Sequence, residues 1–539
     1  MQIKITPRTL GGTEFTAQPA RLHLGAQNAE GVDRLVFQLP AEWAGCSVTL
    51  HIRHSDGTLA APLVLDAAHS APVGRSFTGW PAGQWMLAAT DGKLLGDVSL
   101  DTTISGVETD SRAVHDGDLF VAIRGENIDG HQFITGALEG GALGCLTAVP
   151  PKEAVPGKFY VLVEDTVQAL GQVARAYKAK FPIPVIGITG SVGKTTTKDM
   201  IASVLSQKFR VLKTEGNYNN EIGLPLTLFR LNPQHELCVL EMGMNHFGEI
   251  DYLTRIVSPN VAVITNIGDA HIENLGSREG ILKAKSEIFQ AMTGDDLAVL
   301  NGDDPLLRTL DGKIAPGILW CGADHEPPYE AKEIRQMGAK GLQCKIKTPK
   351  TEFAVTIPAL GNHMIYPVLM ACAIGEKFGM TGEEMKKGVE AFVPTKMRMN
   401  VIRQGDVTIL DDAYNANPQS MRAALEVLSQ TDATFRVAVL GDMFELGELG
   451  PELHRGMGEC AAALGNIDAL LAVGELAWNI YDAAHQAGME GAIYAKDRAA
   501  AKPLLANFIR PGAVILVKAS RGMAFEELTR ELQRLAPKN

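Results

Sequence analysis

The chain has 539 residues, a formal net charge of -12 and a hydrophobic fraction of 46%. That length exceeds what one hydrophobic core supports, so we expect about three or four domains. The acidic balance disfavours a nucleic-acid partner, and the sequence shows neither an apolar signal segment nor the run of roughly 18 apolar residues that a membrane span requires.

The first part of the chain, residues 1–81, predicts a small antiparallel β domain. Short alternating segments at 35–39 and 47–53 are separated by turn signals at 55–57 and 81–83. Residues 84–96 fit either a short helix or a last hairpin of this domain. We assign this part no function, because a partner-binding or regulatory module and a passive appendage fit it equally well.

The rest of the chain predicts α/β domains. Residues 82–181 form a mixed segment that ends in a helical pattern at 167–180, and Phe-Pro-Ile-Pro at 181–184 breaks that helix. Residues 182–393 then alternate strands and helices, and residues 394–539 form a second such series. This alternation predicts parallel, doubly wound sheets with ligands at the carboxyl ends of the strands. The expected strands lie at 185–189, 237–242, 261–267, 297–300, 407–410, 436–440, 469–473 and 513–517, and the expected helices begin at 194 and span 277–292.

The seven cysteines are scattered, odd in number and placed mostly within apolar runs. They predict buried free thiols in a reducing compartment, so we expect a cytoplasmic protein. Their positions are Cys46, Cys145, Cys238, Cys321, Cys344, Cys372 and Cys460.

Residues 185–197 predict a phosphate-binding loop. An apolar strand enters a glycine-rich turn that ends in Gly-Lys-Thr at a helix start. Backbone N–H groups of such a turn bind phosphate oxygens, Lys194 reaches the outer phosphates, and the Thr195 hydroxyl holds Mg²⁺. The strict pattern requires glycine at Ile188, whereas here Gly187 is the glycine, so the loop is a variant. The loop residues are Thr189, Gly190, Ser191, Val192, Gly193, Lys194, Thr195 and Thr196.

Polar side chains follow several expected strands. Glu241 ends the strand at 237–242, where a carboxylate suits a Mg²⁺ site, and Asp269 and His271 follow the next strand. Asn301 and Asp304 follow a further strand and fit contacts to a nucleotide, although turn formation explains them equally well.

Two polar strand ends in the last domain, at 410–418 and 439–447, predict a second site. Helix capping competes as the explanation for Asn417, which precedes a proline. The sequence shows no nucleophile elbow, zinc-ligand spacing or dinucleotide fingerprint.

Together these motifs resemble the ATP-dependent Mur ligases, and within them the MurF type, which adds D-alanyl-D-alanine to UDP-N-acetylmuramoyl-tripeptide. The resemblance covers roughly residues 100–535. Its discriminating strings lie at 109–112, 117–125, 189–196, 216–225, 411–421 and 441–447. The string Asp-Asn-Pro-Arg, expected of the MurE type, is absent.

The resemblance implies three domains: a UDP-substrate-binding domain at 82–181, a central ATPase at 182–393 and a Rossmann-like ligase domain at 394–539. It implies ATP, two Mg²⁺ ions, an acyl phosphate and attack by the dipeptide amine, with a monomer as the working unit. Positioning and charge neutralisation suffice for such a reaction, and no protein nucleophile is required.

The resemblance also implies roles for individual residues. Lys194, Lys285, His271 and Arg398 would be catalytic, Lys285 as a carbamylated lysine, which requires a neutral amine and hence a lowered pKa. Thr195, Glu241, His271 and Lys285 would surround Mg²⁺, and Asn301, Asp304 and Arg398 would join the loop in binding ATP. The substrate residues would be Ser111, Arg112, Asn219, Asn220, Asp412, Tyr414, Asn415 and Asn417.

Three positions depart from the family pattern. Met364 and Pro367 stand where the family usually has asparagines close to the nucleotide, and Ala519 replaces a more usual glycine. Two alternatives stay open: a Mur-like ligase with another amino-acid acceptor, and a non-catalytic nucleotide-sugar-binding regulator.

Overall fold

The computed structural model describes residues 89–96, 103–338 and 341–537 in full, and before residue 82 it describes six strands. The chain divides into two compact units, residues 1–75 and 76–539. In the first unit, an antiparallel sheet has the order β1 (Gln2–Thr9), β4 (Cys46–Arg53), β5 (Leu63–Asp66), and β2 (His23–Leu24) pairs with β3 (Leu35–Val36). The strands predicted at 35–39 and 47–53 overlap β3 and β4. The turn expected at 55–57 and most of the turn expected at 81–83 lie outside the described residues.

The second unit begins with a five-stranded sheet. Its order is β7 (Lys93–Leu95), β12 (Phe159–Leu162), β11 (Gly144–Thr147), β10 (Asp118–Val121), β9 (Gly106–Glu108), parallel except for β7. Helices α2 (Ile134–Glu139) and α3 (Thr166–Lys178) accompany it, and β6 (Trp80–Pro81) pairs with β8 (Thr103–Ile104). Of the ambiguous segment 84–96, residues 89–90 are helical and residues 93–95 form an edge strand, whereas residues 84–88 are outside the described part.

The central sheet has nine strands and places β13, the strand of the phosphate loop, in its interior. Its order is β14 (Val211–Lys213), β15 (Leu237–Glu241), β13 (Val185–Thr189), β16 (Val261–Ile264), β17 (Leu297–Asn301), β18 (Gly317–Gly322), β19 (Tyr329–Gln336), β20 (Leu342–Lys347), β21 (Glu352–Ile357). The sheet is parallel from β14 to β19 and antiparallel from β19 to β21. The expected strands at 185–189, 237–242, 261–267 and 297–300 correspond to β13, β15, β16 and β17.

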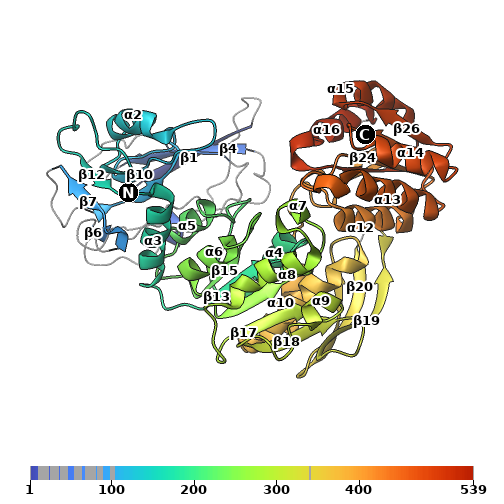
Figure 1. Ribbon diagram of the computed structural model, residues 1–539, viewed down its shortest axis with the longest axis horizontal. Helices are drawn as coiled ribbons and strands as arrows, with labels where there is room; N and C mark the ends of the chain where they lie inside the picture. Colours follow the sequence, from blue (N-terminus) through green and yellow to red (C-terminus); the bar gives the residue numbers. More distant parts are fainter. Residues whose placement is uncertain are drawn as a thin grey trace. The chain divides into compact units, whose positions relative to one another are not determined.

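Helices cover both faces of this sheet. Successive residues of a strand point to opposite faces, and strands such as β13 are buried at every position, so both faces need a covering layer. Val185 belongs to one hydrophobic cluster and Ile186 to the other. The first cluster contains residues of α5 (Gly223–Leu228), α6 (Glu249–Val257) and α8 (Arg278–Ser286), and the second those of α4 (Lys194–Leu205), α10 (Ile365–Lys377) and α11 (Gly382–Glu390). Figure 1 shows this part of the chain in green and yellow. The helix expected at 277–292 is shorter than predicted and continues as a 3-10 turn, Glu287–Phe289.

The last sheet has six strands, all parallel except its first. Its order is β22 (Asn400–Gln404), β23 (Val407–Asp411), β27 (Ala513–Lys518), β24 (Phe435–Gly441), β25 (Ala469–Val473), β26 (Ala492–Ala495). Its helices are α12 (Pro418–Gln430), α13 (Gly450–Ala463), α14 (Trp478–Gln486), α15 (Arg498–Ala501) and α16 (Glu526–Leu535). All four strands expected in this region are present, and the predicted α/β fold class is confirmed.

Within the described parts of the chain, no helix combines the length and apolar character that a membrane span needs. The cysteines described there are free thiols; Cys145, Cys238, Cys321, Cys344 and Cys372 are buried and Cys460 is partly exposed.

Candidate active site

The phosphate loop lies between β13 and α4 and depends on two glycines. Gly190 has φ 148°, and a Cβ there would lie 1.9 Å from the Thr265 hydroxyl oxygen. Gly193 precedes α4 with φ 80°, in the left-handed region, and no neighbouring atom lies within 4 Å of the position of its Cβ. The first glycine therefore allows close packing, and the second allows the turn into the helix.

The residues after β16 hold the loop from behind. The Thr265 hydroxyl donates to the Val192 carbonyl at 2.6 Å, and the Asn266 side chain both donates to this carbonyl and accepts from the Val192 N–H, each at 3.0 Å. Ser191 accepts from the Gly268 N–H at 2.8 Å. Sequence reasoning saw these residues only as a polar strand end, but their strand is the direct neighbour of β13.

The Lys194 ammonium group folds back onto the loop. It donates to the Gly190 carbonyl at 2.7 Å. Burial lowers the pKa of Lys194, the charge of Arg398 adds to this effect, and the carboxylates of Glu241 and Glu445 oppose it. Lys194, at the start of α4, and Arg398, in the segment before β22, thus both contribute positive charge here.

Thr195, Glu241 and Asn219 form a cluster of polar side chains beside the loop, in which Thr195 and Glu241 are buried. The Thr195 hydroxyl donates to Glu241 Oε2 and the Asn219 amide donates to Oε1, both at 2.8 Å. Glu241 is 2% exposed and Thr195 is 3% exposed. A hydroxyl, a carboxylate and an amide together present the oxygen ligands that Mg²⁺ prefers.

His271 contacts Glu445, which lies in the loop after β24. Its Nδ1 lies 2.5 Å from Glu445 Oε2, and contact with His271 and the charge of Lys194 hold the pKa of Glu445 below its usual value. His271 precedes α7 (Ile272–Leu275) with φ 63°. Asp269 lies 3.8 Å from Arg278. In the described part of the chain, no three His, Cys, Asp or Glu side chains form a metal-binding cluster.

Lys285 is a buried lysine near the loop. It lies in α8 with 1% of its surface exposed, and burial, with a contribution from the charge of Lys194, lowers its pKa well below the usual value. Its ammonium group has no hydrogen-bonding or ion-pair partner among the residues that the structure describes. A lysine in these surroundings favours its neutral form.

Arg398 approaches the site from the segment between the central and last sheets. Its guanidinium lies 4.2 Å from the centre of the Tyr414 ring, and its Nε is buried without a hydrogen-bond acceptor in the described chain. Met397 and Met399, on either side of it, have φ 58° and 52°. Non-glycine residues rarely adopt this conformation, so the surroundings must hold the segment in place.

The loop after β23 is tied to the end of β27. Lys518, which is 2% exposed, donates to Asp412 Oδ2 at 2.5 Å and to the Asn415 carbonyl at 3.0 Å. The other oxygen of Asp412 accepts from the Met399 N–H at 3.0 Å. Both carboxylate oxygens of Asp412 are therefore engaged within the protein.

Several other predicted residues have structural partners. Asn417 caps α12 in a reciprocal pair with Ser420, as the capping alternative predicts. Asn415 accepts from the Ala416 N–H, and Asn220 accepts from the N–H of Gly223, the first residue of α5.

Asp304 caps α9 (Pro305–Arg308) and also accepts from the Ile267 N–H at 2.7 Å, so backbone groups use both of its oxygens. Asn301 accepts from the Asp303 N–H. Ser111 and Arg112 follow β9, and Arg112 forms a two-pronged, exposed contact with Asp110 at 2.9 and 2.7 Å.

The three departures from the family pattern lie in packed surroundings. Met364 and Pro367 are buried, at and just inside the start of α10. Ala519 is fully buried, and its Cβ lies 2.6 Å from the position that a Cβ on Gly441 would occupy.

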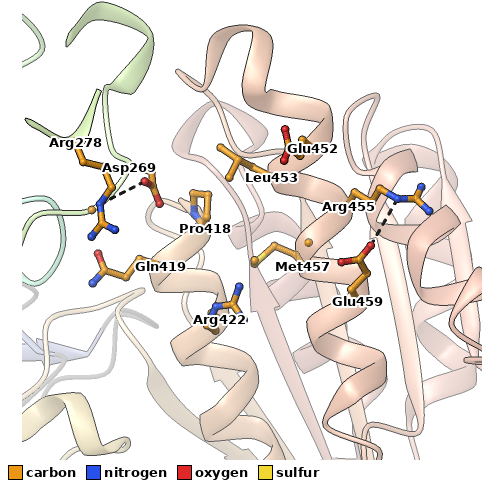
Figure 2. Close-up of a pocket in the computed structure, with 12 residues that line it drawn as sticks. Asp269, Arg278, Pro418, Gln419, Arg422, Glu452, Leu453, Arg455, Met457 and Glu459 are labelled. Carbon is orange, nitrogen blue, oxygen red and sulfur yellow. Dashed lines mark ion pairs between the residues drawn. The ribbon is translucent and has the colours of Figure 1, made fainter. Parts of the chain in front are cut away.

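A pocket of about 620 Å³ opens between the residues after β16 and helices α12 and α13. Figure 2 shows Gln419 and Arg422 projecting from α12 and Glu452 and Glu459 from α13. Its lining contains three arginines and three carboxylates, including the pairs Arg278–Asp269 and Arg455–Glu459. These charges balance, so we assign the pocket no ligand.

Comparison with known families matches three stretches of the chain. Residues 103–178 match the Mur ligase family catalytic domain, residues 188–375 the Mur ligase middle domain, and residues 397–521 the Mur ligase glutamate ligase domain.

Relatives that match over most of their own length are UDP-N-acetylmuramoyl-tripeptide–D-alanyl-D-alanine ligases. That of Bacillus subtilis is 39% identical over 80% of this chain and 93% of its own, and that of Escherichia coli is 36% identical over 80% and 94%. Among solved structures, MurF from Acinetobacter baumannii superposes with a TM-score of 0.78 at 34% identity over 85% of this chain and 99% of its own. The MurF ligase from Thermotoga maritima in complex with ADP gives a TM-score of 0.72 at 30% identity over 80% and 97%.

Proposed function

The chain belongs to the MurF type of the Mur ligase family, and from this premise we propose that it joins D-alanyl-D-alanine to UDP-N-acetylmuramoyl-tripeptide with cleavage of ATP to ADP and inorganic phosphate, in peptidoglycan precursor synthesis. The observation that carries the proposal is the phosphate loop with Lys194 folded onto it and the Thr195–Glu241 contact beside it. The reaction takes place in the cytoplasm, where ATP is available. All the site residues come from one chain, so the proposal needs no second copy.

ATP binds with its phosphates on the loop at 189–196. The relative from Thermotoga maritima was solved with ADP, which supports this nucleotide. Lys194 neutralises the outer phosphates and Arg398 contacts the nucleotide from the other side. The buried Nε of Arg398 lacks an acceptor in the described chain and is therefore available to a ligand. Asn301 and Asp304 lie on the nucleotide side of the site. Their main role there is to stabilise the backbone turn after β17 through their side-chain oxygens.

Two Mg²⁺ ions accompany the nucleotide. The Thr195 hydroxyl and the Glu241 carboxylate fit the first, with His271 contributing directly or through water. Lys285 fits the second as a carbamate, because its buried amine favours the neutral form from which a carbamate arises. Bound Mg²⁺ would neutralise the charge that develops on the transferred phosphoryl group.

The reaction has two steps. The terminal carboxylate of the tripeptide attacks the γ-phosphorus of ATP, which gives an acyl phosphate and ADP. The amine of D-alanyl-D-alanine then attacks the acyl carbon, and a tetrahedral intermediate collapses to the amide and inorganic phosphate. Lys194 and Arg398 stabilise negative charge throughout, and no side chain of the protein forms a covalent bond with a substrate.

The substrates extend on both sides of the nucleotide. We assign the uridine nucleotide to residues 82–181, with Ser111 and Arg112 among its contacts, and Asn219 and Asn220 to the tripeptide side. Tyr414 and Asn415 line the dipeptide side, and Asp412 and Asn417 support that loop from within. Residues 1–81 have no part in this assignment.

Phosphate release tests the function. The chain is incubated with ATP, Mg²⁺ and UDP-N-acetylmuramoyl-tripeptide, with and without D-alanyl-D-alanine, and then with a panel of other amino acids and dipeptides. We expect release that depends on both the tripeptide and D-alanyl-D-alanine. Release with another acceptor only would instead identify a different Mur-like ligase, and nucleotide-sugar binding without release would identify a regulator.

A further inference from the structure

Residues 394–399 connect the central sheet to the last sheet without regular secondary structure, and Arg398 lies within them. A carboxylate holds each end of this connection, buried Asp199 at the first and partly buried Asp412 at the second. Asp199 belongs to α4, the helix that begins at the phosphate loop, and Asp412 belongs to the loop after β23. We call residues 394–399 the hinge segment.

At the first end, the Thr395 hydroxyl donates to Asp199 Oδ2 at 2.5 Å. The other oxygen of Asp199 accepts from Lys213 at 2.7 Å and lies 3.4 Å from Lys198. Asp199 is 8% exposed. Burial alone would raise its pKa, but the two ammonium groups outweigh burial and hold the pKa below the usual value. Asp199 therefore stays charged and accepts a strong hydrogen bond.

At the second end, Asp412 has the same arrangement with a different donor. One of its oxygens accepts from the Met399 N–H and the other from buried Lys518. Between the two ends, the Arg398 N–H points to the Thr395 carbonyl and the Asn400 side-chain oxygen, both at 3.3 Å. Hydrogen bonds thus run without a break from the helix of the phosphate loop, through the hinge segment, to the last sheet.

We propose that Asp199 and Thr395 are positioning residues that fix the hinge segment to the phosphate-loop helix and so aim Arg398 at the nucleotide. The inference rests on the proposed function, in which Arg398 contacts the nucleotide. A carboxylate that only stabilised α4 would need no partner 196 residues away in the chain. The left-handed residues on both sides of Arg398 also need such restraint, because they would relax if the segment were free.

ADP binding in the presence of Mg²⁺, measured by calorimetry on the full chain, tests this inference. Thr395→Val removes the donor hydroxyl and keeps the shape of the side chain, whereas Thr395→Ser keeps the hydroxyl. Thr348→Val is the matched control, because the Thr348 hydroxyl also donates to a buried carboxylate, Glu376, at 2.5 Å, in a different part of the central domain. Arg398→Ala and the double variant Thr395→Val with Arg398→Ala complete the set.

We expect Thr395→Val to weaken ADP binding about fivefold and Thr395→Ser and Thr348→Val to leave it within about twofold. The double variant should bind no more weakly than Arg398→Ala, because Thr395 acts through Arg398. If the fold-losses of ADP affinity in the two single variants multiply in the double variant, Thr395 does not act through Arg398 and the inference is overturned. If Arg398→Ala weakens ADP binding but Thr395→Val does not, the positioning role of Thr395 is overturned and the nucleotide role of Arg398 stands. If Arg398→Ala leaves ADP binding unchanged, both roles are overturned.

Discussion

The Thr195 hydroxyl donates a 2.8 Å hydrogen bond to the carboxylate of Glu241, across the 46 residues that separate them in the chain. The contact exists because β13 and β15 are parallel neighbours, with Ile188 opposite Glu241 in the register. The carboxyl ends of both strands therefore meet at one edge of the sheet, where the loop begins. This edge gathers the oxygen ligands and the loop that binds phosphate.

Glu241→Gln should raise the Mg²⁺ concentration needed for half-maximal activity by about tenfold or more, because the amide keeps the shape but loses the charge. Activity titrated with Mg²⁺ at saturating ATP measures the effect. Glu236→Gln is the matched control, since Glu236 directly precedes the same strand and is exposed. An unchanged Mg²⁺ requirement in Glu241→Gln would remove Glu241 from the metal site.

Gly190→Ala and Gly193→Ala should differ in their cost to stability. The new methyl group at Gly190 would meet the Thr265 hydroxyl at 1.9 Å, so we expect a loss of roughly 3 kcal/mol. The methyl group at Gly193 would meet nothing, and only the left-handed backbone penalty of about 1 kcal/mol applies. Urea denaturation of both variants checks the order, and equal losses would contradict the packing of the loop against Thr265.

Lys285→Met should stabilise the protein by about 1 kcal/mol at neutral pH while it abolishes ligation. The pKa of Lys285 is lower in the folded protein than its unfolded value of 10.5. The penalty for burying this amine therefore grows as the pH falls below the unfolded value, and it is complete below the folded value. The gain in Lys285→Met should accordingly shrink at alkaline pH.

Thermal unfolding of Lys285→Met and the parent chain, from neutral pH to above the unfolded pKa of 10.5, measures the gain in stability. In parallel, ¹³C NMR of the chain in ¹³C-bicarbonate should show a carbamate signal that Lys285→Met lacks. A destabilised Lys285→Met would contradict the buried, unpaired amine, and an unchanged carbamate signal would assign the carbamate to another lysine.

Asn417→Ala should cost about 1 kcal/mol of stability, because it removes the cap of α12. Asn417→Ser keeps a capping oxygen, so the free energy of unfolding should stay close to the parent value. The KM for D-alanyl-D-alanine should stay within about twofold of the parent value. Denaturation and steady-state kinetics of the two variants measure these effects. A raised KM in a fully stable Asn417→Ser would show that this side chain contacts the dipeptide.

The sequence predicted the strands near the phosphate loop well, because their signals are local. The segment 185–189 is apolar and short, and Gly193 and Lys194 mark the helix start, so β13 has the expected bounds and α4 begins at the expected residue. Strands β18 to β21 were not predicted. Several of them alternate buried and exposed residues beside charged side chains, as in β20, and their pairing depends on the antiparallel extension of the sheet.

The parts of the site that the sequence missed depend on long-range contacts. Thr395 has no motif, and it matters only because the fold brings it to Asp199. Lys518 likewise acquires its place from the pairing of β23 with β27, which sets it beside Asp412. For Asp304 and Asn417 the sequence left open ligand contact and a local turn or cap. The structure shows that both cap helices, α9 and α12, and their ligand contacts stay predictions.

The transfer of a carboxylate oxygen to phosphate tests the central claim most directly. UDP-N-acetylmuramoyl-tripeptide labelled with ¹⁸O in its terminal carboxylate is ligated to D-alanyl-D-alanine with unlabelled ATP, and the released phosphate is examined by mass spectrometry. If the ATP held by Lys194 and Thr195 phosphorylates the carboxylate, each phosphate carries one ¹⁸O atom from the tripeptide. Phosphate without ¹⁸O, released together with the ligated product, would contradict the acyl-phosphate route.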